Sequence, residues 1–476
     1  MKSSQEADSV WNKLPAELWF VVAENARRED LPFFARVSTL FCLASRQPLY
    51  RRVSLRTSDS FKATFDLFKD PRFSECVETL ELDYLYPTTE VPLSEFPSLI
   101  SGMSNLRSIK IRNCYLFASA PEHALFFQTV KSSCPLLTEF EYAEPSSIEF
   151  TDFSLKNIKN LVWYGYYGHI IEPAMSLFVA SLASLTRISL RTEYTIDPLT
   201  IIPFCSLNFP WLTFLELPPW AGGGRDFPEA QAALTRFLIA HGSITDLELA
   251  YCGSEEFPSS VELDPDLITI DILPNLRSLN ARATVVSMMA MRGCKCLKFL
   301  TSLATGCASS AEARDGFDIF IESLGNSNSL LKHLSFHPGQ EFSNNYDNFD
   351  EWLDLLSKAF RDVEAFNCEI AQGITIRTFF AFLSKFRNLR NLHVLWYGHS
   401  ADYTLNRMLE IAEPSCPRLE KIYCEGSAGE TRVIQISRDH AAGTSVSTQL
   451  VENNELELPF GRHSRYMISR SSLQPH

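Results

Sequence analysis

The stretch Leu106-Arg-Ser-Ile109-Lys-Ile111-Arg-Asn-Cys114 decides the fold, because the spacing of its apolar residues recurs through most of the chain. Two apolar residues that flank one polar residue, as Ile109 and Ile111 do, are typical of a half-buried β-strand. Thirteen hexapeptides share the spacing, and they begin at Val77, Leu106, Leu137, Ile158, Leu185, Leu212, Ile244, Leu276, Leu297, Leu331, Val363, Leu389 and Leu419. One such hexapeptide is a weak signal, but thirteen indicate an internal repeat.

The step between hexapeptides varies from 21 to 34 residues, and from Val77 to Leu419 it averages 28.5 residues. Helical spacing follows several of the expected strands, for example over residues 227–242. Cys114 and Cys252 stand at the ninth position of their repeats, where leucine-rich repeats carry Asn or Cys. The chain therefore resembles the long, ribonuclease-inhibitor-like leucine-rich repeats.

This resemblance implies an α/β solenoid, a horseshoe with parallel strands on its concave face and helices outside. One strand-and-helix unit cannot bury its own apolar faces, so neighbouring units must stack. Because side chains alternate along a strand, the fourth and sixth positions should point into the core, together with the first. The third, fifth and seventh positions should then face the concave side.

The N-terminal segment, residues 11–57, lacks the repeat and is predicted to be helical. Leu14, Leu18, Val21 and Val22 lie on one helix face, and Pro15 stands at a first-turn position. Asp30 should cap a second helix that carries Phe34, Val37 and Phe41 and stops at Pro48.

These residues resemble the F-box, a helical module of about 45 residues. The match consists of Leu14-Pro15-Ala16-Glu17-Leu18, Asp30-Leu31, Val37-Ser38, Phe41 and Leu49-Tyr50, with Phe41 in place of the Trp common in the family. The resemblance implies docking on a Skp-type adaptor and, through it, on cullin and RING subunits. It assigns adaptor contact to Leu14, Pro15, Leu18, Val22, Leu31, Val37, Phe41, Leu49 and Tyr50.

F-box and repeats together resemble the F-box/leucine-rich-repeat proteins, the substrate-recognition subunits of Skp-cullin-F-box ubiquitin ligases. By that resemblance the chain is a non-catalytic adaptor without cofactor that binds a protein substrate for ubiquitination and proteasomal degradation. One alternative is a ligase-independent interaction scaffold, whose helical segment only caps the solenoid. Another is an enzyme that uses His333, His337 and His393, three histidines on predicted strands.

Charge and composition narrow the remaining classes of function. The net charge of −14 argues against a nucleic-acid binder. No apolar run is long enough for a membrane span and no secretory signal is visible, so we expect an intracellular protein of the cytoplasm or nucleus. The 12 cysteines lack zinc-type spacing, which predicts buried reduced thiols and no metal; Cys294 and Cys296 are the closest pair.

The last strands offer the better substrate surface, since the early strands carry many charges that are expensive to desolvate. We predict substrate contact at His333, His337, Asn367, His393, Leu395, Trp396 and Tyr423. Two predicted strands end in similar sequences, Trp163-Tyr-Gly165 and Trp396-Tyr-Gly398, whose aromatic residues either bind a partner or pack at the rim of the solenoid. The expected organisation is a disordered N-terminus (1–10), the F-box (11–57), about thirteen irregular repeats (58–425), and a C-terminal cap with a frayed tail (426–476).

Overall fold

A computed structural model of the chain divides into two compact units, Met1–Tyr194 (unit 1) and Thr195–His476 (unit 2). The structure describes residues 15–55, 65–83, 96–112, 120–143, 154–165, 170–192, 194–220, 227–249, 251–252, 259–306, 321, 330–337, 354–370, 376–396, 412, 415–425, 431–439 and 443–451.

Unit 1 begins with three helices, here called the helical module. They are α1 (Ala16–Asn25), α2 (Leu31–Phe34) and α3 (Thr39–Tyr50). The predicted second helix is in fact two, because the Ser38 hydroxyl accepts a hydrogen bond from the Phe41 amide at 3.2 Å and starts a new helix there. Asp30 makes no side-chain cap, and Pro48 lies inside α3, which continues to Tyr50. Trp19, Ala23, Leu31 and Ala44 form the small core of the module.

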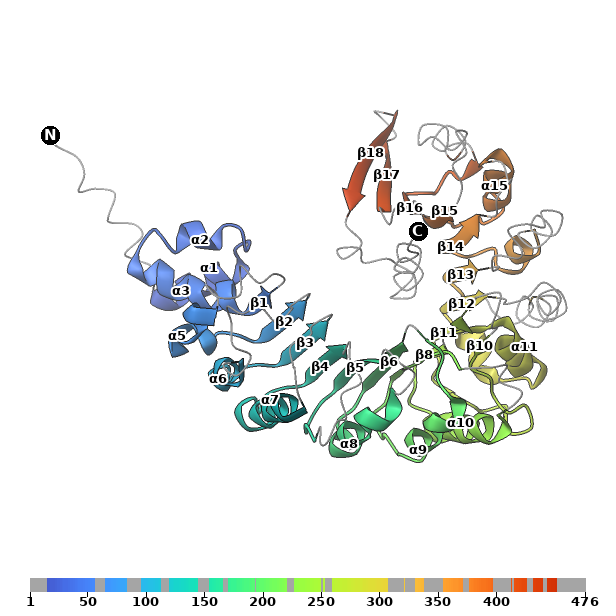
Figure 1. Cartoon of the computed structure of the whole chain (residues 1–476). Coiled ribbons are helices and arrows are strands. Elements are labelled where there is room, and N and C mark those ends of the chain that lie inside the picture. Colours follow the sequence, from blue (N-terminus) through green and yellow to red (C-terminus); the bar gives the residue numbers. More distant parts are fainter. Residues whose placement is uncertain are drawn as a thin grey trace, which may run out of the picture. The chain divides into compact units, whose positions relative to one another are not determined.

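A parallel sheet follows the module in unit 1, and helices line one of its faces (Figure 1). Its strands are β1 (Arg52–Leu55), β2 (Thr79–Asp83), β3 (Ser108–Arg112), β4 (Glu139–Ala143), β5 (Asn160–Gly165) and β6 (Arg187–Thr192). Its helices are α5 (Pro71–Ser74), α6 (Phe96–Ser101), α7 (Ala120–Ser133) and α8 (Ile171–Ser181). Strand β1 adds a turn of the solenoid that the sequence pattern did not reveal.

Unit 2 continues the same architecture. Its parallel strands are β7 (Phe214–Leu217), β8 (Asp246–Leu249), β11 (Ser278–Arg282), β12 (Ser302–Gly306), β13 (His333–His337), β14 (Ala365–Ile370), β15 (Asn391–Trp396) and β16 (Lys421–Glu425). Its helices are η3 (Pro198–Ile201), α9 (Ile202–Cys205), α10 (Pro228–Ala240), α11 (Ala283–Met291), η5 (Lys295–Phe299) and α15 (Ile376–Leu383). Strands β9 (Tyr251–Cys252) and β10 (Ser259–Ser260) form a separate small hairpin.

The sheet of unit 2 ends in an antiparallel hairpin. Strand β17 (Thr431–Asp439) pairs antiparallel with β16, and β18 (Gly443–Val451) pairs antiparallel with β17 (Figure 1). This hairpin lies in the predicted C-terminal cap, and it changes the direction of pairing after the last parallel strand.

One backbone arrangement recurs at the second residue of many hexapeptides. The carbonyl of Glu78 accepts from the amides of Arg107 and Ser108 at 2.8 and 3.0 Å, and the carbonyl of Thr245 accepts likewise from Arg277 and Ser278. At Thr138, Thr186 and Thr245 the side-chain hydroxyl adds a third bond, which runs from Thr186 to the Lys159 carbonyl at 3.1 Å. In these repeats the start of one strand is thus hydrogen-bonded to the preceding repeat.

The strand pairing confirms the parallel-strand solenoid, and strands lie at twelve of the thirteen predicted positions, whereas the strand predicted at Leu297 is displaced along the chain. Leu303, and not Leu300, pairs with Leu279 on one side and with Leu334 on the other. Leu297 and Leu300 fit the apolar spacing as well as Leu300 and Leu303 do. Residues from Lys295 to Phe299 instead form the helix η5.

Candidate protein-interaction surfaces

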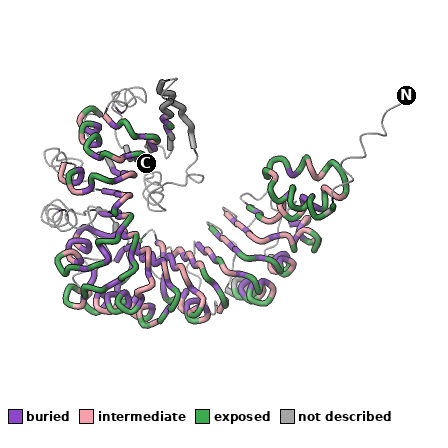
Figure 2. Tube along the Cα trace, turned by 180° about the vertical axis from the view of Figure 1, so that it is seen from behind, coloured by how far each residue is buried: buried purple, intermediate pink, exposed green. Residues whose placement is uncertain are grey.

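The helical module is largely exposed (Figure 2), and several of its exposed residues are large and apolar. Its core is small, so many of its apolar side chains point outward. The exposed fraction is 57% for Val21, 67% for Val37 and 68% for Phe33. The full set, here called the apolar module surface, is Leu18, Phe20, Val21, Val22, Phe33, Val37 and Leu43. Exposed apolar groups gathered on one small element mark an interaction site.

The predicted adaptor contacts divide between surface and core. Pro15, Leu18, Val22 and Val37 are exposed, whereas Leu31 is only 2% exposed and belongs to the module core. Leu31 therefore presents no surface to a partner, and this correction follows from its contact with the buried face of α1 and α3.

Three further predicted contacts are engaged within the chain, and a fourth lies outside the described residues. Phe41 and Leu49 pack partly buried against the module core, with the rings of Phe41 and Trp19 4.3 Å apart. Tyr50 packs edge-on against Phe73, with ring centroids 5.1 Å apart, and also against Phe68. Leu14 is the residue that the structure does not describe.

The exposure of Leu18 and Val22 on α1 agrees with their predicted role in adaptor contact, but the sequence analysis did not identify the buried face of this helix. Leu18, Val21 and Val22 form an apolar face, which by itself suggests a core contact, yet the buried face of α1 carries Trp19 and Ala23. An exposed apolar face beside a buried one makes α1 a candidate for contact with a partner.

Ion pairs and aromatic contacts anchor the module on the first turn of the solenoid. Arg51, just after α3, lies 2.5 Å from the Glu24 carboxylate of α1 and 3.3 Å from Glu78 beside β2. The Arg46 guanidinium lies over the Phe73 ring at 5.3 Å. Module and first strands therefore form one continuous packed body.

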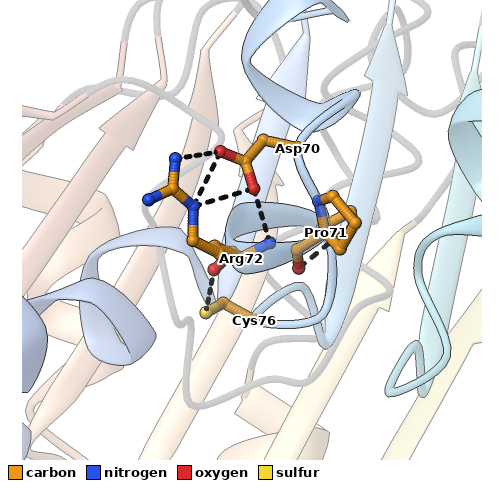
Figure 3. A network of polar contacts seen from close by, with 5 residues as sticks. Asp70, Pro71, Arg72 and Cys76 are labelled. Carbon is orange, nitrogen blue, oxygen red and sulfur yellow. Dashed lines mark hydrogen bonds and ion pairs between the residues drawn. The ribbon is translucent and has the colours of Figure 1, made fainter.

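A network of polar contacts lies at the start of α5, close to the contacts between the helical module and the first strands (Figure 3). The Asp70 carboxylate caps α5 by accepting from the Arg72 amide at 2.9 Å, and it also accepts from the Arg72 guanidinium. These hydrogen bonds hold the pKa of Asp70 below its ordinary value. Burial raises the pKa of the Cys76 thiol, which donates to the Arg72 carbonyl at 3.3 Å, so Cys76 is a packing residue.

The sheet face opposite the helices, here called the helix-free face, is lined with ion pairs in unit 1. Lys110 pairs with Glu81 at 2.8 Å, and Arg112 makes a two-pronged contact with Glu141 at 2.6 and 2.8 Å. Burial alone would raise the pKa of Glu81, but the hydrogen bond and charge of Lys110 outweigh it and lower that pKa. Glu81, Lys110 and Glu141 remain half-buried and reachable from solvent.

The two aromatic residues at the end of β5, Trp163 and Tyr164, differ in their exposure to solvent. Trp163 is buried and lies against Tyr142, with ring centroids 5.1 Å apart, so the packing alternative holds for this residue. Tyr164 is half-buried, and the Arg191 guanidinium lies over its ring at 5.6 Å.

In unit 2 three of the seven predicted substrate residues are buried. Asn367 and His393 are 0% exposed and Tyr423 is 6% exposed, although all three occupy fifth positions of their repeats. These three side chains are therefore not accessible to a substrate, which corrects their predicted role in substrate contact. His393 and Tyr423 lie edge-on with ring centroids 6.3 Å apart. Among the residues that the structure describes, neither polar atom of the Asn367 side-chain amide has a hydrogen-bond partner.

The other predicted substrate residues lie on the same strands. His333 is half-buried, and burial lowers the pKa of its imidazole despite the opposing charge of Glu364. His337, Leu395 and Trp396 belong to β13 and β15, but their side chains lie outside the described part of the structure.

Chemistry-bearing residues are dispersed in the part of the chain that the structure describes. Among these residues no group of three or more His, Cys, Asp or Glu side chains is placed to hold a metal ion. Burial raises the pKa of Cys294 to about 11 and of Cys296 to about 12, so both stay protonated thiols at neutral pH. Within the described helices none is both long and apolar enough to cross a bilayer.

Comparison with known proteins gives distant structural likeness alone. No protein-family model matches the chain, and no curated protein matches its sequence. The leucine-rich repeat-containing protein LegL7 from Legionella pneumophila is similar at 12% identity and TM-score 0.37, over 82% of this chain and 95% of that one. The yeast Rad7 and Elc1 complex is similar at 15% identity and TM-score 0.36, over 90% of this chain and 94% of that one. TM-scores this low carry no argument about the fold, so the repeat fold is assigned from the strand pairing alone.

Proposed function

We propose that the chain is the substrate-recognition subunit of a Skp-cullin-F-box ubiquitin ligase. The observation that carries this proposal is the apolar module surface, which lies at the start of a leucine-rich-repeat solenoid. A protein of this kind needs one surface for the ligase machinery and another for its substrate. The three-helix module supplies the first surface and the repeats supply the second.

The Skp-type adaptor would cover Leu18, Val21 and Val37 and the apolar residues beside them. Burying apolar surface is worth about 25 cal/mol for each Å², so such a surface supports a stable complex without ion pairs. Cullin and RING subunits would join through the adaptor. Because this machinery is intracellular, the chain would act in the cytoplasm or nucleus.

The chain itself would catalyse no reaction in this proposal. It would hold a protein substrate close to the ubiquitin-charged conjugating enzyme and so raise the effective concentration of the acceptor lysines. The anchoring of the module by Arg51 and Phe73 supports this role, since a firmly attached module fixes the offset between the machinery and unit 1. The substrate would contact the helix-free face, and its identity awaits direct isolation.

The proposal is tested with two charge-introducing variants of the full chain, Val21→Asp and Val37→Asp. Each places a carboxylate in the apolar module surface, and each should weaken binding of a purified Skp adaptor by about 30-fold, the effect of losing a hot spot worth about 2 kcal/mol. Val179→Asp is the matched control, because Val179 is 55% exposed but lies on α8 of the solenoid. Equal binding by all three variants and the unmodified chain, measured by calorimetry with circular dichroism to check folding, would refute the proposal.

A further inference from the structure

The last strand of the sheet in unit 2 leaves one edge without a partner. Strand β18 pairs with β17 over nine residue pairs, from Gly443 opposite Asp439 to Val451 opposite Thr431. It stands last in the order of strands, and no segment among the described residues pairs with its outer edge. The outer edge of such a strand presents backbone N–H and C=O groups that can pair with another chain.

The composition of β18 offers none of the usual protection against edge pairing. Its nine residues, Gly-Thr-Ser-Val-Ser-Thr-Gln-Leu-Val, include no Lys, Arg, Asp, Glu or Pro. Native edge strands are commonly short, charged or interrupted by Pro. Strand β18 is also longer than the average strand of about five or six residues.

The opposite end of the strand series is protected. Strand β1 has only four residues, begins with Arg52 and follows directly from α3 of the helical module. Arg28 of the module also donates to the Arg52 carbonyl at 2.9 Å. The chain thus covers its first edge strand with three helices, whereas the described residues leave β18 uncovered.

We propose that two copies of this chain associate by antiparallel pairing of their β18 strands. A two-fold axis through Ser447 would place that residue opposite its own copy and Val446 opposite Thr448. In this register all nine residues pair, and no two like charges meet, because the strand carries none. A contact of this kind is closed and symmetric, so it stops at the dimer.

The second copy is favoured as occupant because it matches β18 in length and in its lack of charge. The net charge of −14 for each copy opposes association, and this repulsion is screened over about 8 Å at physiological ionic strength. The dimer should therefore tighten as salt is added, whereas a complex held by opposite charges would weaken.

Analytical ultracentrifugation of the full chain tests the proposal with a charge-swap series at Ser447. Ser447→Lys and Ser447→Glu each place like charges opposite one another in the symmetric register, and each should weaken the dimer at least about tenfold. An equimolar mixture of the two variants should restore dimers, because Lys then meets Glu. This rescue would not occur if the substitutions had only unfolded the hairpin.

Three outcomes would overturn the proposal. They are a monomeric chain at all concentrations and salt levels, a dimer that both single variants leave intact, and variant chains that fail to recover on mixing. If the chain is monomeric, the hydrogen-exchange rates of the β18 backbone amides then show whether the outer edge of this strand is covered or open. Slow exchange in a monomer means that the chain covers its own edge, and fast exchange means that the edge is open for an extended segment of another protein. The test is independent of the adaptor, so its failure leaves the proposed function standing.

Discussion

Stability of unit 2 should depend on His241, a buried histidine that joins two successive repeats. Its Nδ1 lies 2.7 Å from the Phe237 carbonyl of α10, while its Nε2 accepts a hydrogen bond from the Phe209 amide at 2.9 Å. Its ring stacks on Phe237, with centroids 3.9 Å apart. In this arrangement Nδ1 carries the proton and donates, so the imidazole is neutral.

Replacement of His241 by Leu removes the acceptor and leaves the buried Phe209 amide unpaired. Such an unpaired group costs about 1–3 kcal/mol, so the free energy of unfolding should fall by that amount at pH 8. His241→Gln is the matched control, because its side-chain oxygen can reach the same amide and does not titrate. This variant should keep most of the stability.

Acidification should narrow the difference between the unmodified chain and the Leu variant. Burial lowers the pKa of His241 below its ordinary value of 6.5, even though the Phe237 carbonyl opposes the shift. The unfolded chain then binds a proton near pH 6.5 that the folded chain does not bind. The stabilisation by neutral His241 is therefore complete above pH 6.5 and is lost as pH falls below it, by at most about 1.4 kcal/mol for each pH unit.

Urea unfolding of the three proteins between pH 5 and pH 8 measures these differences, and the other histidines cancel because all three proteins share them. Hydrogen exchange of the Phe209 amide provides a local check, since that amide should be protected in the unmodified chain and exposed to exchange in the Leu variant. A difference between Leu variant and unmodified chain that stays constant with pH, or that grows on acidification, would refute this account of His241.

Two further predictions concern packing. Asn367→Leu should raise the free energy of unfolding, measured by urea titration, by about 1–3 kcal/mol. The reason is that the substitution removes a buried side-chain amide that has no hydrogen-bond partner among the described residues. A loss of stability would show that this amide is hydrogen-bonded in solution. Gly165→Ala should lower the melting temperature, since a Cβ at Gly165 would lie only 3.0 Å from the Ile170 Cβ and overpacking costs about 1–3 kcal/mol. Gly242→Ala is its control, with a nearest contact of 3.4 Å, and equal melting temperatures for both variants would contradict the packing argument.

The repeat architecture could be predicted from the sequence because each strand carries its own signal. The fourth residue of each hexapeptide is apolar and pairs with the fourth residue of the next, so the register follows from spacing alone. The prediction failed where the spacing was ambiguous, at Leu297, Leu300 and Leu303. The prediction also missed β1. The hexapeptide that contains this strand begins at Tyr50, which is the last residue of α3, so the strand and helix patterns overlap there.

The surfaces could be predicted only in part, because exposure depends on contacts that are distant in sequence. Leu31 matches an adaptor-binding position by spacing, yet the small core of the module uses it for packing. Asn367 and His393 occupy positions that alternation places on the helix-free face, yet both are buried. Alternation fixes the side of a sheet to which a residue points, but it says nothing of what covers that side.

The central claim is that the helical module links the repeats to a cullin-based ligase, and its most direct test is purification of the full chain from its own cells. Quantitative mass spectrometry of the purified complex should find a Skp-type adaptor and a cullin, each in about one-to-one ratio with the chain. A chain that carries both Val21→Asp and Val37→Asp should lose both partners and keep its fold. Absence of adaptor and cullin from the unmodified, folded chain would contradict the claim.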